Sequence, residues 1–288
     1  MPERESKRIV LDASKVREFD FQVAGHPGVL EVEGDGMIIK PLYQRELEFY
    51  ECPGIPSELR TFMPLFYGSL EHAGATSSGE PEKKKYLCLE NIVHGFKEPC
   101  VIDIKIGSRL YDIDATPEKR ERTLKTANET TTGKLGVYIT GMRVRGQPAV
   151  DRQWCRGLTP TTMMDALDMY FAPAEQHVSA EYRRQVVEQF IKEISELKAV
   201  LEQCETRMYS GSLLLVYEAS KERYEALVAK PDTDSKAGSS DSDDDGVLIN
   251  MRAIDFTHSH WTPGQGCDDL YLAGLSNLIK TLGTTLQR

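Results

Sequence analysis

The sequence predicts an α+β fold with two lobes, a β-rich amino-terminal lobe over residues 17–92 and a larger lobe over residues 93–288. Two patterns carry this prediction. In the first lobe, short apolar segments alternate with glycine-rich turns, which is typical of antiparallel strands. In the second, apolar residues recur at helical spacing over residues 175–205, between segments with the pattern of strands. The 288 residues, 40% hydrophobic and 28% charged, suffice for one large core or two modest ones.

The amino-terminal lobe is expected to contain short strands and one short helix. In order, the elements are a strand, a glycine-rich turn and a strand within 19–42, a helix over 44–53 that ends at Pro53, and strands at 62–70 and 85–92. The polar residues 71–85 are expected to form a mobile loop. Residues 1–16 are polar and are expected to be frayed.

The carboxy-terminal lobe mixes strands and helices. Residues 116–129 predict a basic helix with Thr116 as its N-cap and Pro117 at its first position. The other expected elements are strands at 99–106, 133–144, 211–219 and 248–256, and the long helix at 175–205. Residues 230–246 hold six acids against two lysines, so they cannot support a core and are predicted to form a disordered acidic loop.

Composition argues against several classes of protein. The longest uncharged apolar run, residues 213–217, is far too short to span a membrane, and the first eight residues lack the apolar stretch of a secretory signal. The six cysteines form no CxxC pair, so we expect reduced thiols, no structural zinc and a location in the nucleus and cytoplasm. A net charge of −10 argues against direct nucleic-acid binding, and an anionic substrate would need a local basic cluster.

The stretch PCVIDIKIGSRLYD, residues 99–112, combines an apolar strand pattern with alternating charges. Side chains alternate in an extended segment, so Asp103 and Lys105 share one face and the isoleucines share the other. One interpretation is an edge strand with a solvated ion pair, which contributes little to stability. The other is a ligand-facing strand, whose carboxylate accepts hydrogen bonds from hydroxyls and whose ammonium meets an anion. The alternation by itself leaves both open.

Other residues suggest a nucleotide-dependent kinase. Lys40 ends a strand after a glycine-bearing hairpin and precedes a helix that contains Glu46 and Glu48, which supplies a cation for phosphates and a carboxylate to orient it. Asp255 ends an apolar strand beside Phe256, where a carboxylate can hold Mg²⁺ between phosphate oxygens. Singly, Lys40 and Asp255 could equally be ordinary strand ends. No GxxxxGK[ST], HRD or GxGxxG motif occurs, so neither a P-loop enzyme nor an ordinary protein kinase is supported.

Four ordered motifs together resemble the inositol polyphosphate kinase family. Residues 99–107 match the family signature PxxxDxKxG, and they are followed by the Ser-Leu-Leu element at 212–214, by IDF at 254–256 and by DDLYLAGLSNLIKTL near the end. QVAGH and RELEFYE are similar to the family's amino-terminal lobe. The resemblance covers nearly the whole chain and is greatest to the fungal multikinases. It implies a two-lobed inositol polyphosphate kinase fold, distantly protein-kinase-like, with ATP between the lobes.

The resemblance implies roles for the residues that bind ATP. Lys40 would contact the α and β phosphates, with Glu46 as its orienting partner and Glu48 as the alternative. The segment around Glu90 and Ile92 resembles the hinge between the lobes, so backbone groups of these two residues would meet adenine.

Further roles follow for the strand residues. Asp103 would accept hydrogen bonds from the ribose, while Lys105 would reach both the transferring phosphoryl group and the inositol phosphate. Asp255 would ligate Mg²⁺, which makes Lys105 and Asp255 the expected catalytic pair. Ser212 would lie nearby in support.

The inositol phosphate would bind the segment 108–135, because a polyanion needs several charge-assisted contacts to replace its hydration. Lys119 and Arg122 are three residues apart and share one face of the expected helix. The implied substrate-binding residues are Arg109, Lys119, Arg122, Lys125, His258 and Lys105. His258 resembles the family histidine that touches a substrate hydroxyl or phosphate, whereas His260 has no such counterpart.

The sequence therefore predicts a kinase that uses ATP and Mg²⁺ to convert soluble inositol trisphosphate to tetrakis- and pentakisphosphate, without a covalent enzyme intermediate. No general base is identified. An alternative is a hexakisphosphate kinase that makes pyrophosphates. An alternative of another class is a non-catalytic scaffold with transcription regulators as partners, which the presence of all the implied active-site residues argues against.

Overall fold

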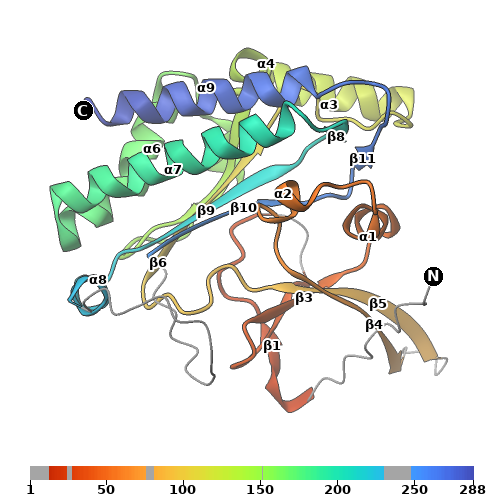
Figure 1. Ribbon diagram of the computed structural model, residues 1–288, viewed down its shortest axis with the longest axis horizontal. Helices are drawn as coiled ribbons and strands as arrows, with labels where there is room; N and C mark the ends of the chain where they lie inside the picture. Colours follow the sequence, from red (N-terminus) through yellow and green to blue (C-terminus); the bar gives the residue numbers. More distant parts are fainter. Residues whose placement is uncertain (1–12, 25–27, 76–80, 151, 230–247) are drawn as a thin grey trace.

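The computed structural model describes residues 13–24, 28–75, 81–150, 152–229 and 248–288. The two larger antiparallel sheets, of five and four strands, lie in two lobes, and a third sheet has two strands, so the predicted α+β, two-lobed class is confirmed (Figure 1). The chain passes from the first sheet to the second between residues 90 and 99. Within the described ranges, no helix has the length and apolar character needed to cross a membrane.

The amino-terminal lobe is built on a five-stranded sheet of order β1-β2-β3-β5-β4. Its elements are η1 (Ala13–Lys15), β1 (Val16–Glu18), β2 (Leu30–Val32), β3 (Met37–Pro41), α1 (Gln44–Glu51), α2 (Ser57–Arg60), β4 (Phe66–Ala75) and β5 (Pro81–Glu90). Helix α1 buries Glu46, Phe49 and Tyr50. These residues are spaced three and four apart, so they lie on one face of the helix.

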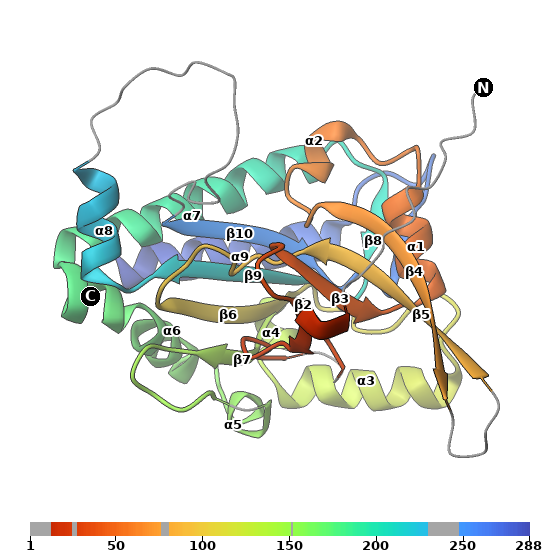
Figure 2. The ribbon, with the colours of Figure 1, turned by 90° about the horizontal axis from the view of Figure 1, so that it is seen from below.

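The carboxy-terminal lobe is built on a four-stranded sheet of order β10-β9-β6-β7. Its elements are β6 (Pro99–Ile106), α3 (Pro117–Glu129), α4 (Thr132–Leu135), β7 (Val137–Arg143), α5 (Arg152–Arg156), α6 (Thr162–Pro173), the π-helical η2 (Ala174–Val178), α7 (Ala180–Leu201), β8 (Thr206–Met208), β9 (Ser212–Glu218), α8 (Lys221–Val228), β10 (Ile249–Ile254), β11 (Ser259–Trp261) and α9 (Asp269–Thr285). Helices α6, α7 and α9 lie on one side of this sheet and the amino-terminal lobe on the other (Figures 1 and 2). The sheet is therefore the layer that can face a ligand held between the lobes.

Strand β6, which carries Asp103 and Lys105, is a central strand. It pairs with β9 on one side and β7 on the other, so the edge-strand interpretation is wrong. The register with β7 shifts between Asp103 and Ile104, because Gly141 lies opposite Asp103 and Ile139 opposite Ile104. The extra residue at this bulge is Thr140, whose side chain is thereby re-aimed.

The two lobes share one hydrophobic core. Phe256, which follows β10 in the carboxy-terminal lobe, stacks on Phe49 of α1 with ring centroids 4.9 Å apart, and it meets Tyr50 edge-on at 5.4 Å. Aromatic contacts of this kind contribute about 0.5–1.5 kcal/mol beyond the burial of apolar area. They fix the end of β10 against the helix that carries Glu46.

Several sequence expectations are corrected. Residues 71–75 and 81–85 belong to β4 and β5 rather than to a loop, because backbone pairing and the cross-strand ion pair of Glu71 with Lys85, at 3.1 Å, support polar strands. Ala13–Lys15 form η1, and Val16 pairs with Val32, so these residues are not frayed. Residues 1–12, and the predicted acidic loop at 230–246, lie outside the described residues.

Helix boundaries also differ in places. The long helix spans Ala180–Leu201 rather than 175–205, since Ser179 has extended backbone and accepts a hydrogen bond from Tyr182 N as its N-cap. The basic helix begins as predicted, with Thr116 accepting from Lys119 N at 3.3 Å and proline at its first position. The expected strand at 133–144 begins only at Val137, after the short helix α4.

Candidate active site

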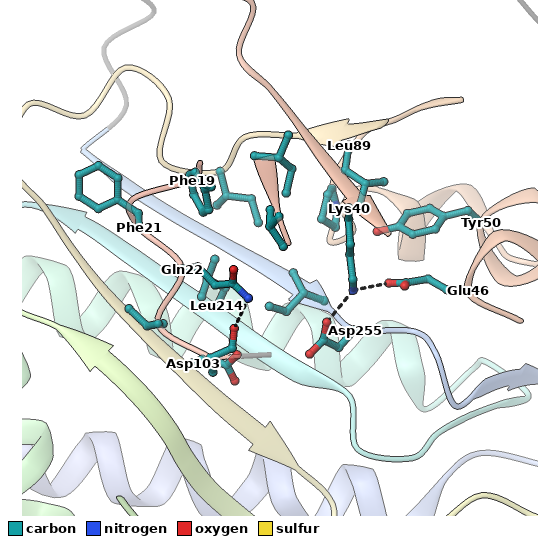
Figure 3. A pocket seen from close by; sticks show the side chains of 17 residues that line it. Phe19, Phe21, Gln22, Lys40, Glu46, Tyr50, Leu89, Asp103, Leu214 and Asp255 are labelled. Carbon is teal, nitrogen blue, oxygen red and sulfur yellow. Dashed lines mark hydrogen bonds and ion pairs between the residues drawn. The ribbon is translucent and has the colours of Figure 1, made fainter. Parts of the chain in front are cut away.

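A cleft lies between the lobes, and its walls come from both of them (Figure 3). It encloses about 680 Å³, including space open to solvent. The apolar walls include Phe19, Phe21, Val29, Ile38, Leu89, Ile92, Leu214 and Ile254, and the polar lining consists of Gln22, Lys40, Glu46, Asp103 and Asp255. Apolar walls with a few convergent polar groups are typical of a small-molecule site.

Lys40 lies between two carboxylates from opposite lobes (Figure 3). Its Nζ donates to Glu46 Oε1 at 2.9 Å and to Asp255 Oδ1 at 2.7 Å, and its side chain is 15% exposed. The structure thus pairs Lys40 with Glu46, which is buried. Glu48 is exposed and accepts a hydrogen bond from Gln44 at 3.1 Å. Helix periodicity separates the two acids, because residues two apart face different sides.

The opposite charges in this cluster stabilise one another in their ionised forms. Burial would lower the pKa of Lys40, but Asp255 and Glu46 raise it well above its usual value, so the ammonium stays charged. Burial raises the pKa of Glu46, an effect that the charge of Lys40 opposes. A buried, fixed ammonium is suited to binding phosphate oxygens, because its charge is screened little by solvent.

Asp255 is held in an unusual backbone conformation. Its φ is +64°, and among the described residues only Ser210, at +56°, is another non-glycine residue with positive φ. Such a conformation costs an L-residue about 1–2 kcal/mol and is concentrated at functional sites. Phe256 N donates to Glu46 Oε1 at 3.3 Å, which together with the ring contacts of Phe256 stabilises the strained turn.

Lys105 lies beside the same carboxylate. Its Nζ is 3.8 Å from Asp255 Oδ2, and it donates to Ser210 O at 2.8 Å and to Ser212 Oγ at 3.3 Å. Both strained residues therefore contact this one ammonium. The structure brings Lys40, Lys105, Glu46 and Asp255 into a single cluster, with Ser212 as a supporting hydrogen-bond partner.

Asp103 is almost completely buried at the bulge of β6. Thr140 Oγ1 donates to Asp103 Oδ1 at 2.7 Å. Burial raises the pKa of Asp103, while the nearby Lys105 opposes the rise. Asp103 lines the same cleft as Lys40, and its carboxylate is thus placed to accept hydrogen bonds from a ligand in the cleft.

Of the two expected hinge residues, Ile92 lines the cleft and Glu90 does not. Glu90 ends β5 opposite Met37, and its carboxylate accepts from Leu65 N at 3.1 Å and pairs with Arg252 at 3.3 Å. Ile92 lines the cleft, and its carbonyl accepts from Asn250 Nδ2 at 3.2 Å. The side chain of Glu90 is therefore occupied by structural contacts, which leaves backbone contact with a ligand as its expected role.

The basic residues of the segment 108–135 separate into two groups. Lys119 is half-buried, on the side of α3 that packs on the protein, and it is close enough to His258 to influence its pKa. Arg122 is exposed at the flank of that side. Lys125 lies on the outer side of α3, 75% exposed and 3.8 Å from Glu129, so the structure does not bring it to the cluster.

Arg109 is held between two aromatic rings. Its guanidinium lies 4.5 Å from the ring centroid of Tyr111 and 4.3 Å from that of Tyr209, and its Nε donates to Tyr111 O at 3.0 Å. Cation–π contacts on both faces immobilise the group. Arg109 is thus held in place by Tyr111 and Tyr209.

A buried network around Asp112 was not predicted from the sequence. Asp112 pairs with Arg45 of α1, with His258 Nδ1 at 2.9 Å and with His260 Nε2 at 2.6 Å. Burial opposes ionisation of this carboxyl, but the hydrogen bonds of His260, Ile113 N and His258 lower its pKa to about 2. The spacing of His258 and His260 was a signal, since side chains two residues apart in extended backbone point the same way, although His258 lies in the turn just before β11.

The segment over residues 19–24 is a second unpredicted part of the cleft. Phe19, Phe21 and Gln22 line it, and Arg143 lies 4.5 Å from the ring centroid of Phe21. The segment crosses β7 at Gly141, where a Cβ would come within 2.0 Å of Val23 O. Only glycine fits this crossing, which no local pattern reveals because the two segments are far apart in the sequence.

The cluster fits a divalent cation together with nucleotide phosphates. Glu46 Oε2 is buried with no hydrogen-bond partner, and a cation-bound water beside Asp255 would satisfy it. In the part of the chain that the structure describes, no three His, Cys, Asp or Glu side chains form a metal cluster. Phosphate oxygens and water would therefore complete the coordination, as is usual for Mg²⁺.

Comparison with known proteins agrees with this geometry. The inositol polyphosphate kinase family model matches residues 86–283. The chain is 30% identical to the inositol polyphosphate multikinase of Saccharomyces cerevisiae, over 91% of this chain and 96% of that protein, and 28% identical to that of Schizosaccharomyces pombe, over 95% and 99%. It is 33% identical to inositol hexakisphosphate kinase 1 of Rattus norvegicus, over 69% of this chain and 51% of that protein.

Solved structures give the same result. The crystal structure of the inositol phosphate multikinase Ipk2 from Saccharomyces cerevisiae, in complex with ADP and Mn²⁺, superposes with a TM-score of 0.73 and 33% sequence identity, covering 87% of this chain and 99% of that one. The family model matches more than half of the chain, and the fold matches that of the Saccharomyces cerevisiae enzyme. The chain therefore belongs to the inositol polyphosphate kinase family.

Proposed function

We propose that this enzyme is an inositol polyphosphate multikinase, which transfers the γ-phosphoryl group of ATP to hydroxyls of soluble inositol polyphosphates and converts trisphosphate to tetrakis- and pentakisphosphate. One observation carries the proposal: Lys40, Lys105, Glu46 and Asp255 form one cluster, and three of them line a cleft with apolar walls. The multikinase matches cover 91% and 95% of the chain, whereas the hexakisphosphate kinase match covers 69%, which favours the multikinase.

On the nucleotide side, the residues bind and orient ATP. The apolar walls would enclose adenine, with backbone groups of Glu90 and Ile92 at its edge, and Asp103 would accept hydrogen bonds from the ribose. Lys40, fixed by Glu46, would bind the α and β phosphates. Phosphoryl transfer depends mainly on alignment and charge neutralisation. An ammonium that is already fixed before ATP binds stabilises the phosphates without a further free-energy cost of reorganisation.

At the reacting phosphoryl group, Lys105 would neutralise the charge that develops on the equatorial oxygens. Ser210 O and Ser212 Oγ hold its ammonium in place. Asp255 would hold Mg²⁺, which would supply positive charge to neutralise the phosphate oxygens. The carboxylate of Asp255 lies between the ammonium groups of Lys40 and Lys105.

On the acceptor side, Lys119 and Arg122 of α3 and the fixed Arg109 would bind the phosphates of the inositol. Charged side chains at a few positions discriminate the number and placement of phosphates loosely, which suits an enzyme that acts on successive products. His258, whose pKa is lowered by the charge of Lys119, would touch the attacking hydroxyl. The hydroxyl oxygen then attacks in line, without an enzyme-bound intermediate.

The test is an Mg·ATP assay of the purified protein on inositol 1,4,5-trisphosphate and, separately, inositol hexakisphosphate, with anion-exchange separation of the products. Lys105→Ala is the inactive control, and Lys125→Ala, an exposed lysine on the outer side of α3, is the matched active control. Stepwise formation of tetrakis- and pentakisphosphate, lost in Lys105→Ala, supports the proposal. Turnover of hexakisphosphate alone would identify the protein as a pyrophosphate-forming kinase. No activity on either substrate would favour a scaffold.

The cellular setting is a separate part of the proposal. The six thiols are all free, which suits the reducing nucleus and cytoplasm, where transcription regulators are further candidate partners. Imaging of a tagged chain at native expression level tests the location. Recovery of transcription regulators with the tagged chain, but not with an unrelated tagged kinase, tests the partners.

A further inference from the structure

Asp112 is a buried carboxylate that joins both lobes on the acceptor side of the cleft. It is 1% exposed and binds Arg45 of α1, Ile113 N at 2.7 Å, and the two histidines. His258 approaches Oδ2 at 2.9 Å and His260 approaches Oδ1 at 2.6 Å. An ionised carboxylate only accepts hydrogen bonds, so the imidazole nitrogens that face it must carry protons.

His258 is linked to the segment that carries Tyr209 and Ser210 and lies within electrostatic reach of α3. Its carbonyl accepts from Tyr209 N at 3.2 Å, and the next residue, Ser210, holds the ammonium of Lys105. On its other side Lys119 is near enough to act on its charge. His258 is thus hydrogen-bonded through its backbone to the segment that holds Lys105, and its side chain is within electrostatic reach of Lys119.

We propose that Asp112 is a positioning residue for phosphoryl transfer: it holds Nδ1–H of His258, so that the unprotonated Nε2 accepts the hydrogen bond of the attacking inositol hydroxyl. This inference rests on the proposed function and deepens it, because it assigns the group that orients the acceptor. His260 binds the same carboxylate through Nε2, so the two histidines are held in opposite tautomers.

This arrangement accounts for the bonds and the proton that change in the transfer step. The hydroxyl oxygen forms a bond to the γ-phosphorus, and the bond between that phosphorus and the bridging oxygen breaks, with its electron pair leaving on ADP. The hydroxyl proton passes to Nε2 of His258, and the imidazolium returns it to solvent when the product leaves. Asp112 stays ionised throughout and stabilises the imidazolium.

The charges around His258 favour this cycle. The charged groups that act on it are Asp112 from the loop before α3, Lys119 from α3 and Arg45 from α1, and His260 of β11 shares its carboxylate. Burial and the charge of Lys119 lower the pKa of His258, while Asp112 opposes this change. The imidazole is therefore neutral near pH 7 and available as an acceptor.

The test compares Asp112→Asn with Asp114→Asn. Asp114 is a matched control because it also pairs with Arg45, at 2.7 Å, but is 61% exposed and binds neither histidine. In Asp112→Asn we expect kcat for inositol phosphate to fall about 10²–10⁴-fold, by analogy with the loss of a tautomer-setting carboxylate, while the Kd for ADP stays within about twofold. The acidic limb of the pH–rate profile should move to lower pH, because loss of the carboxylate lowers the pKa of His258.

A spectroscopic measurement keeps the proposal testable if Asp112→Asn folds poorly. Long-range ¹H–¹⁵N spectra of the wild-type protein, assigned with His258→Asn, should show His258 protonated at Nδ1 and free at Nε2. The Nε2–H tautomer in the wild type, or Asp112→Asn activity within threefold of Asp114→Asn, would overturn the proposal. A wild type inactive on every inositol phosphate would remove the proposed function itself, a result distinct from a wrong tautomer.

Discussion

Lys40 and Asp255 are separated by 214 residues of sequence, yet Lys40 Nζ lies 2.7 Å from Asp255 Oδ1. This contact joins β3 of one lobe to the end of β10 in the other. It depends on Phe256, whose ring is fixed by Phe49 and Tyr50 of α1. The same helix supplies Glu46, so one packing contact places three charged groups around a common point.

Replacement of Asp255 by Asn should abolish turnover and leave the fold intact. Asn adopts the left-handed backbone that Asp255 requires more readily than most residues, but it lacks the charge that would hold Mg²⁺. We expect kcat to fall at least about 10²–10³-fold, with little change in Tm. Steady-state kinetics and thermal melting check this, and a variant that keeps most of its activity would contradict the metal assignment.

Comparison of Glu46→Gln with Glu48→Gln tests which of the two glutamates orients Lys40. Loss of the buried charge next to Lys40 should weaken ATP binding about tenfold and destabilise the fold by about 1–3 kcal/mol. Glu48→Gln changes only an exposed side chain and should leave both quantities unchanged. Nucleotide titration and denaturant unfolding measure the two effects, and equal behaviour of the two variants would refute the assignment.

Gly141→Ala should displace the segment over residues 19–24. The new Cβ would come within 2.0 Å of Val23 O, a distance that forces the segment off β7 and opens the wall formed by Phe19 and Phe21. We expect weaker ADP binding and a fold that remains cooperative. Gly283→Ala in α9, where no atom lies within 4 Å of the added Cβ, is the control and should bind ADP normally.

Lys119→Ala and Lys125→Ala should differ in their effect on the inositol phosphate. Lys119 is half-buried and its charge acts on His258, whereas Lys125 faces outward and pairs with Glu129. A charge-assisted hydrogen bond contributes about 1.5–3 kcal/mol, so Lys119→Ala should raise KM for the inositol phosphate about 10–100-fold. The KM for ATP should not change in either variant. A larger effect at Lys125 would place the substrate on the outer side of α3.

The pKa of Asp112 predicts a dependence of stability on pH. Its pKa of about 2 in the folded protein lies below the usual aspartate pKa of 3.8, so the unfolded chain binds the proton more tightly. The stabilisation is fully present above about pH 5 and is lost as pH falls from about 4 to 2, for a total of about 2 kcal/mol. Urea unfolding from pH 5 to 2 should show this loss in the wild type and in Asp114→Asn, but a flatter profile in Asp112→Asn.

The sequence determined the parts of this protein that depend on local pattern. The alternation in β6, the apolar stripe of α7 and the N-cap of α3 each follow from backbone periodicity or capping, and the structure contains all three elements. The ordered motifs also identified the family, which the comparisons confirm. Lys40, Glu46, Asp103, Lys105 and Asp255 could be named because each lies within or next to such a motif.

Only the tertiary structure decided which of these residues meet. Strand order made β6 a central strand, and helix geometry turned Glu46 inward and Lys125 outward. The contacts of Asp112 with Arg45, His258 and His260 span up to 148 residues, and the crossing at Gly141 joins two distant segments. No local pattern encodes such contacts, because their geometry depends on how the two sheets pack around a shared core.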